Sequence, residues 1–199
     1  MAGLHEYNTR ICCQCGSAKI TAMGTILNTA TEPKPKPLKR NKHLVSLSRE
    51  HHTGLLFGWK IKQGLSKQVP LKVLLNYLRF FWESHLREHF AQEENELNSL
   101  LPLHDPMRVA VEEDHRILEE KIKRLLSGKV ATEAEFLALA DFLTAHIRFE
   151  ERDFFPYLEQ HLTAEQLAKI GLSLHPLKPE KEEDFKPAFW LRDYAGQAA

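Results

Sequence analysis

The chain twice places a histidine and a glutamate at helical spacing inside an apolar stretch. The two segments share the pattern His-x-x-x-Glu-Glu: "HFAQEENEL" at 89–97 and "HIRFEERDFF" at 146–155. Residues four apart lie on one face of an α-helix, so His89 lies on the same face as Glu93, and His146 on the same face as Glu150. In both segments the shared face is the apolar one. Two helices that bury charged residues in this way need a common partner in the interior.

Apolar residues recur with the helical period through most of residues 41–171, and no segment alternates with the period of a strand. The expected helices span 41–66, 70–100, 105–128, 132–156 and 163–171. Their start signals are N-cap residues, some with a capping-box partner: Asp105 before Pro106, Thr132 with Glu135, and Thr163 with Gln166. Pro156 should kink or end the fourth helix. The expected fold is all-α, an up-down-up-down four-helix bundle with a short extra C-terminal helix.

The first expected helix adds a third histidine position. Its apolar residues are Leu44, Leu47, Leu55 and Trp59, and His51 fills the long gap between Leu47 and Leu55. This spacing favours His51 as the inward histidine. His52 fits another face of the same helix, so the choice between the two stays open.

The ends of the chain have a different composition from the helical part. Residues 1–39 carry Cys12, Cys13 and Cys15 and a Pro/Lys-rich linker, and we expect a disordered leader whose translation starts at Met1 or Met23. Residues 40–175 form the expected bundle domain. Residues 176–199 form a polar tail with aromatic anchors, which are Phe185, Phe189 and Trp190.

Charge and hydropathy exclude several classes of function. Lys plus Arg and Asp plus Glu both number 27, and this balance gives no argument for a nucleic-acid partner. No apolar run approaches the roughly 20 residues that a membrane span needs. The N-terminal residues lack a basic segment followed by an apolar one, so we do not expect them to be a signal peptide. We therefore expect a cytoplasmic protein that contacts neither nucleic acid nor membrane.

A carboxylate in an apolar core costs several kcal/mol unless it is compensated. The expected bundle would bring together a histidine from each of two helices and a His–Glu pair from each of the other two: His51, His89, Glu93, His115, His146 and Glu150. Two interpretations compete, a network of His–Glu ion pairs and a metal site. Imidazole and carboxylate ligands suit non-haem iron or manganese, while structural zinc more often recruits cysteine.

These segments, with "LSREHHTGLL" and "EEDHRILEE", resemble the hemerythrin-like (HHE cation-binding) family over roughly residues 41–160. The resemblance implies a four-helix bundle that holds two non-haem iron ions, with manganese or zinc ranked behind iron. It assigns the ligand positions to the six residues above, with Glu93 and Glu150 as bridging carboxylates. His115-x-x-x-Glu119 departs from the third-helix His-x-x-x-His of oxygen-carrying members.

The resemblance implies a metal-binding protein that takes a small ligand such as oxygen, NO or peroxide, together with an electron-transfer partner. Sensing, scavenging, storage and iron donation would all use this site. Two alternatives stay open: a di-iron oxidase or peroxidase enzyme, and a metal-free helical interaction module. An enzyme would need a substrate pocket and a proton donor near the metals, for which His85 and Glu119 are the candidates. Glu94 and Glu151 are expected outside the ligand set.

Overall fold

The computed structural model describes residues 39–128, 131–174 and 185–191. Within these ranges every regular element is helical and none is a strand, which confirms the predicted all-α class. The predictions for residues 1–38, including the cysteine cluster and the start at Met1 or Met23, lie outside the described residues. So does most of the tail.

The helical elements follow the predicted order with shifted ends. They are α1 (Val45–Ser66), α2 (Leu71–Phe81), η1 (Trp82–Leu86), α3 (Arg87–Gln92), η2 (Glu93–Leu97), η3 (Asn98–Leu100), α4 (Pro106–Leu126), α5 (Glu133–Phe149), η4 (Glu150–Phe154), α6 (Phe155–His161) and α7 (Ala164–Ser173). The second predicted helix thus remains helical from α2 to η3. The elements η1, η2 and η4 are π-helical turns, and η3 is a 3₁₀ turn.

Most of the predicted caps are present. The Asp105 carboxylate accepts hydrogen bonds from the backbone N–H groups of Met107 and Arg108. Thr163 and Gln166 form the complete capping box of α7. The Thr132 hydroxyl accepts from the N–H of Glu135, whose carboxylate pairs with Arg124.

The fourth predicted helix does not end at Pro156. The chain stays helical to His161, and the π-helical turn η4 comes immediately before the proline. A proline ring clashes with the carbonyl of the preceding turn in a regular α-helix. A π-helical turn changes the local bonding pattern at that point, so the chain can pass Pro156 without leaving the helical conformation.

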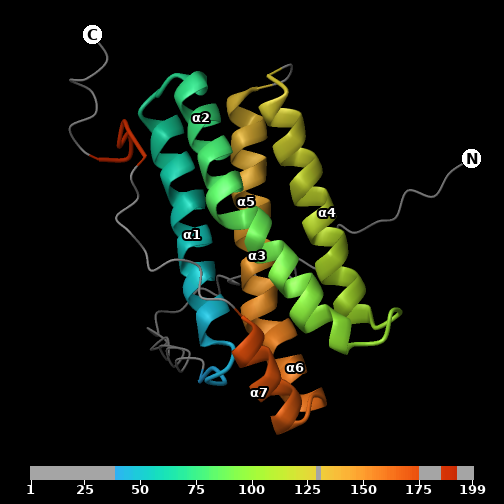
Figure 1. The fold of residues 1–199 in the computed structure, drawn as a ribbon. Helices are drawn as coiled ribbons and strands as arrows, with labels where there is room; N and C mark the ends of the chain where they lie inside the picture. Colours follow the sequence, from blue (N-terminus) through green and yellow to red (C-terminus); the bar gives the residue numbers. More distant parts are fainter. Residues whose placement is uncertain (1–38, 129–130, 175–184, 192–199) are drawn as a thin grey trace, which may run out of the picture. The chain divides into compact units, whose positions relative to one another are not determined.

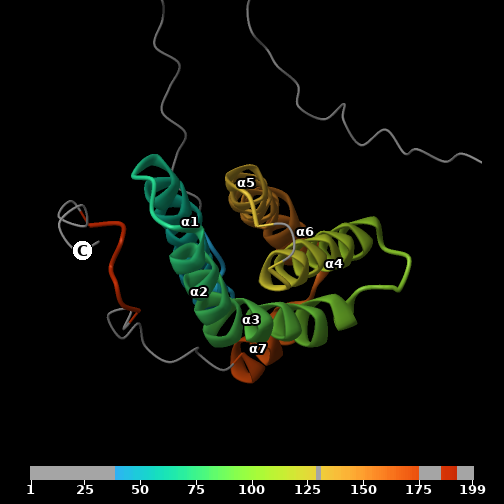
Figure 2. The same ribbon diagram turned by 90° about the horizontal axis from the view of Figure 1, so that it is seen from above.

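The four columns α1, α2–α3, α4 and α5 lie around a common interior (Figures 1 and 2). Neighbouring columns contact each other, with α1 against α5 and α2, and α4 against α5 and α2. The buried apolar residues form two clusters. The first includes Phe57, Leu118 and Leu143, and the second includes Leu47 and Phe154. Along each column the buried His and Glu residues fall between members of the two clusters.

The predicted inward face of the first helix is wrong at two positions. Leu55 and Trp59 are 36% and 48% exposed. The face of α1 toward α5 instead carries Gly54 and Gly58, and a Cβ at Gly54 would lie 2.6 Å from Cδ1 of Ile147. Glycines without side chains let the two helices approach closely, and Leu55 and Trp59 lie away from this contact.

The described part of the tail packs on the bundle through its aromatic residues. Phe189 is fully buried, and its ring centroid lies 5.2 Å from that of Tyr77. Trp190 also packs on Tyr77, and the Lys67 ammonium donates to the Trp190 carbonyl at 2.7 Å. These contacts fasten residues 185–191 to α1 and α2.

No helix in the described part of the chain is long and apolar enough to cross a membrane.

Gly54→Leu should lower the free energy of unfolding by about 2 kcal/mol, because the added side chain overpacks the contact with Ile147. Adding Ile147→Ala should recover part of this loss, since it removes the atom that the new Cβ meets. Denaturant unfolding measures both. As a control, Leu56→Gln on the exposed side of α1 should change the stability by less than about 0.5 kcal/mol. Equal losses in the single and double variants would contradict the proposed contact.

Candidate metal centre

The structure brings the six predicted residues together in the middle of the bundle. All are buried, with exposed fractions of 0% for Glu93 and Glu150, 2% for His51, His115 and His146, and 6% for His89. They come from α1, α3, η2, α4, α5 and η4. We call this set the inner cluster.

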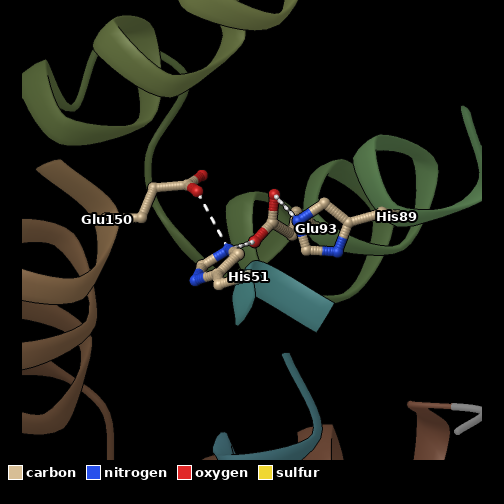
Figure 3. A group of neighbouring side chains, drawn as sticks. All are labelled: His51, His89, Glu93 and Glu150. Carbon is tan, nitrogen blue, oxygen red and sulfur yellow. Dashed lines mark ion pairs between the residues drawn. The ribbon is translucent and has the colours of Figure 1, made fainter. Parts of the chain in front are cut away.

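The two glutamates lie between the imidazoles. Nε2 of His51 is 3.1 Å from Oε2 of Glu150 and 3.4 Å from Oε1 of Glu93 (Figure 3). Nε2 of His115 is 3.3 Å from Oε2 of Glu93 and 3.8 Å from Oε1 of Glu150. Each carboxylate therefore directs one oxygen to His51 and the other to His115.

The remaining histidines complete two groups of ligand atoms. His89 and His51 with both glutamates form one group, and His115 and His146 with both glutamates form the other. Within each group the ligand atoms all lie within 4.8 Å of one another. Each group offers two nitrogens and two oxygens, and both groups share the same two carboxylates. Two cations held side by side by bridging carboxylates fit this arrangement.

The inward atoms of the cluster are not satisfied within the protein. Nε2 of His51, His115 and His146 and all four carboxylate oxygens of Glu93 and Glu150 are buried without a hydrogen bond. Buried polar atoms without partners are rare and costly in folded proteins. Seven such atoms in one cluster could serve together as ligands, so the residues present fit a metal ion.

The opposite ring nitrogens, by contrast, all have partners. Nδ1 of His51 is 2.7 Å from Oε1 of Glu151, and Nδ1 of His89 is 2.8 Å from Oε2 of Glu50. The pKa of Glu151 is about 2, because the hydrogen bonds from His51 and its other partners outweigh the opposing effect of burial. Glu151 is therefore an anion that holds the back of the His51 ring.

The other two histidines are held in the same way. Nδ1 of His115 lies 3.0 Å from Oε1 of Glu94, and Nδ1 of His146 lies 3.3 Å from Oδ2 of Asp114. A carboxylate at Nδ1 fixes the proton there and leaves the Nε2 lone pair pointing inward. All four imidazoles are thereby oriented to act as metal ligands.

These outer carboxylates, Glu50, Glu94, Asp114 and Glu151, form a closed ring of support. Glu50 of α1 bonds to the histidine of α3. Glu94, in the turn η2 that follows α3, bonds to the histidine of α4. Helix α4 supplies the carboxylate for the histidine of α5, and the turn after α5 supplies the one for α1. Each column thus positions the ligand of the next.

The charges within the inner cluster depend on each other. Burial opposes the charged form of His51 and His115, but the adjacent carboxylates outweigh it and raise the pKa of both imidazoles well above the usual value. Burial also opposes the charge on Glu93, yet His89 and the other imidazoles hold its pKa well below the usual range. The pKa of Glu150 is lowered despite burial and repulsion from Glu93. The cluster therefore needs positive charge, which protons or metal cations can supply.

Aromatic rings cover two of the imidazoles. Phe90 stacks on His115 with ring centroids 4.0 Å apart, and Phe155 stacks on His51 at 5.2 Å. Both rings are buried. They restrict the tilt of the imidazoles and keep water from that side.

The structure shows which of the undecided residues belong to the inner cluster. His52 is exposed on α1, whereas His51 lies in the inner cluster. Glu119 pairs with Lys123 on the surface of α4 and does not join the cluster. His85 is half-buried beside Phe81, with ring centroids 5.0 Å apart, and it is not among the grouped ligand atoms.

The role of the acidic residues next to the inner cluster was not predicted from the sequence. Glu50 precedes His51 and Asp114 precedes His115, while Glu94 and Glu151 follow the two inner glutamates. Four of the six inner residues, His51, Glu93, His115 and Glu150, thus adjoin an acid of the ring along the chain, and this is the signal that could have found the ring. The partner of each acid lies on another helix, and a single helix's periodicity does not reveal it.

Comparison with known proteins points to one family. A family model described as the hemerythrin HHE cation binding domain matches residues 43–158, a range that contains the inner cluster and all four outer carboxylates. No curated protein and no solved structure matches the chain.

Glu94→Gln should weaken the binding of a divalent metal by about tenfold, because the amide is a poorer partner for Nδ1–H of His115. The affinity can be followed with cobalt(II) through its visible bands. Glu88→Gln is the matched control, since Glu88 is exposed on α3 and lies outside the ring. Equal affinity in the two variants would remove the outer carboxylate from the metal site.

Proposed function

This chain belongs to the hemerythrin family of HHE cation-binding domains, and on that premise we propose that it is a non-haem di-iron protein. The proposed ligands are the six residues of the inner cluster, with Glu93 and Glu150 bridging the two ions. The proposed activity is the binding of a small molecule such as oxygen, NO or peroxide at the iron centre.

One observation carries the proposal: seven buried donor atoms converge without hydrogen-bond partners. An ion-pair network would align its N–H groups with the carboxylate oxygens, but the inward atoms here lack that alignment. Metal ions would satisfy these atoms at once and neutralise both glutamates. This is the reason for preferring a metal site to a metal-free interaction module.

The donor set favours iron over other metals. Each group offers two imidazole nitrogens and two carboxylate oxygens, and none of its ligands is a cysteine, as structural zinc would prefer. Manganese favours carboxylate and water over imidazole. Two nitrogens and two oxygens for each ion would leave coordination positions open for a small molecule.

When bound, the irons supply electron transfer and coordination of the small molecule. The protein holds the imidazoles through the outer carboxylates, and Phe90 and Phe155 keep water away from two of the rings. Glu119 lies on the surface, so the helix α4 contributes one histidine and no ligand one turn later. This supports sensing, scavenging, storage or iron donation, with an electron-transfer partner, over oxygen transport.

The domain and its topology are part of the proposal. We infer that residues 40–175 form the unit that holds the centre, with the columns α1, α2–α3, α4 and α5 in up-down-up-down order. The alternating direction of successive columns in Figure 1 supports this order.

A di-iron oxidase or peroxidase is a second candidate. A cavity of about 820 Å³ reaches His51, His89 and His146, and His85 also lines it. The cavity provides the substrate space that an enzyme requires, and His85 is the candidate proton donor on its lining.

Protein produced with ample iron should contain about two irons per chain and show a near-ultraviolet oxo-bridge band. His51→Ala should lose most of this iron, because it removes a buried ligand of one ion. His52→Ala is the matched control on the exposed face of α1 and should keep the wild-type content. Elemental analysis decides the matter. Iron-free wild-type protein that also fails to take up ferrous iron anaerobically would refute the di-iron proposal.

Removing the iron with a chelator should lower the melting temperature by about 5–10 °C, since ligands that bind only the folded state stabilise it. Calorimetry of the loaded and chelated protein measures the difference. Chelator added to His51→Ala should cause a much smaller change, because that variant has little iron to lose. An unchanged midpoint after complete iron removal from the wild type would count against a metal centre.

A further inference from the structure

The cavity beside the inner cluster is much larger than the proposed small ligand needs. Its volume is about 820 Å³. A water-sized molecule occupies roughly 30 Å³, and pockets for organic ligands span roughly 300–1,000 Å³. The cavity is therefore of the size that receives an organic molecule.

The cavity has apolar walls and a polar floor. Phe81, Leu86, Leu143 and Ile147 line it and are at most 4% exposed. The floor is formed by members of the inner cluster: His51, His89 and His146. An apolar group in the cavity would therefore lie against the proposed metal ligands.

The helix that forms one wall is itself irregular. The π-helical turn η1 spans Trp82–Leu86, and His85 and Leu86 from this turn line the cavity. Such turns inside α-helices occur often at functional sites. This π-helical turn lies beside the cavity, and its His85 is one turn before His89.

Arg49 and His52 are the exposed residues at the cavity's rim. Two other charged residues of the lining have partners within the protein: Arg40 pairs with Glu151, and Glu50 bonds to His89. Among the residues that the structure describes, Arg49 has no ion pair. The rim therefore offers a positive charge to an incoming anion.

We propose that the cavity binds an aliphatic monocarboxylate, with its apolar chain against Phe81, Leu86, Leu143 and Ile147 and its carboxylate at Arg49. The proposal rests on the proposed function in one respect, because the iron centre would form the floor. The size of the cavity, its apolar walls and its cationic rim each support this class of ligand.

Isothermal titration of decanoate into the iron-loaded full-length chain tests the proposal. Saturable binding of one decanoate per chain is expected. Arg49→Gln should weaken decanoate binding about fivefold, as expected for an exposed ion pair, and should leave the binding of 1-decanol unchanged. An unchanged decanoate affinity in Arg49→Gln would overturn the assignment of the carboxylate to this residue.

Two variants test the location. Leu86→Trp fills the apolar part of the cavity, and Ser46→Trp narrows it from a half-buried lining position that tolerates a larger side chain better. Both should reduce decanoate binding at least tenfold while iron content stays at the wild-type value. Val109→Trp is the control on the exposed face of α4 and should bind decanoate normally. Undiminished binding in both cavity variants would overturn the proposed site.

The failure of this proposal is distinguishable from the failure of the proposed function. Iron-loaded protein that binds no decanoate would overturn the carboxylate site and leave the di-iron centre in place. Protein that takes up no iron but binds decanoate with dependence on Arg49 and Leu86 would support the site and refute the centre.

Discussion

The carboxylates of Glu93 and Glu150 lie in the interior with no exposure to solvent, and their charge must be balanced there. Four imidazoles surround them, each held from behind by another carboxylate. The acids of the outer ring are partly exposed to solvent, and Arg40 pairs with one of them, Glu151. From the centre outward the groups are therefore carboxylates, then imidazoles, then carboxylates again. The four columns pack around this arrangement.

Helical spacing was sufficient to predict the all-α class, the helix order and five residues of the inner cluster, and it favoured His51 over His52 for the sixth. The two His-x-x-x-Glu segments indicate which face each helix buries, because the His and the Glu lie on the same face as the apolar residues of that helix. The match to the family confirms the resemblance that the same segments suggested. The role of these residues as iron ligands remains a proposal.

Other features depend on contacts between helices, which periodicity does not report. Gly54 and Gly58 face α5, but a glycine contributes no apolar signal, so Leu55 and Trp59 were wrongly assigned to the interior. The outer carboxylates were missed as partners because each one serves a histidine on a different column. The π-helical turns were missed because the sequence pattern of a π turn differs little from that of the α-helix around it.

The inner cluster lies across the bundle and divides the apolar interior into two separate hydrophobic clusters. Helices α1 and α4 contribute residues to both clusters, and their members of the inner cluster, His51 and His115, lie between those residues. The larger cluster contains the junction of α1, α2 and the tail, and the smaller one contains α6 and α7. A protein built in this way has two potential unfolding units, one around each hydrophobic cluster. The charge balance of the inner cluster between them then affects whether the two units unfold together or separately.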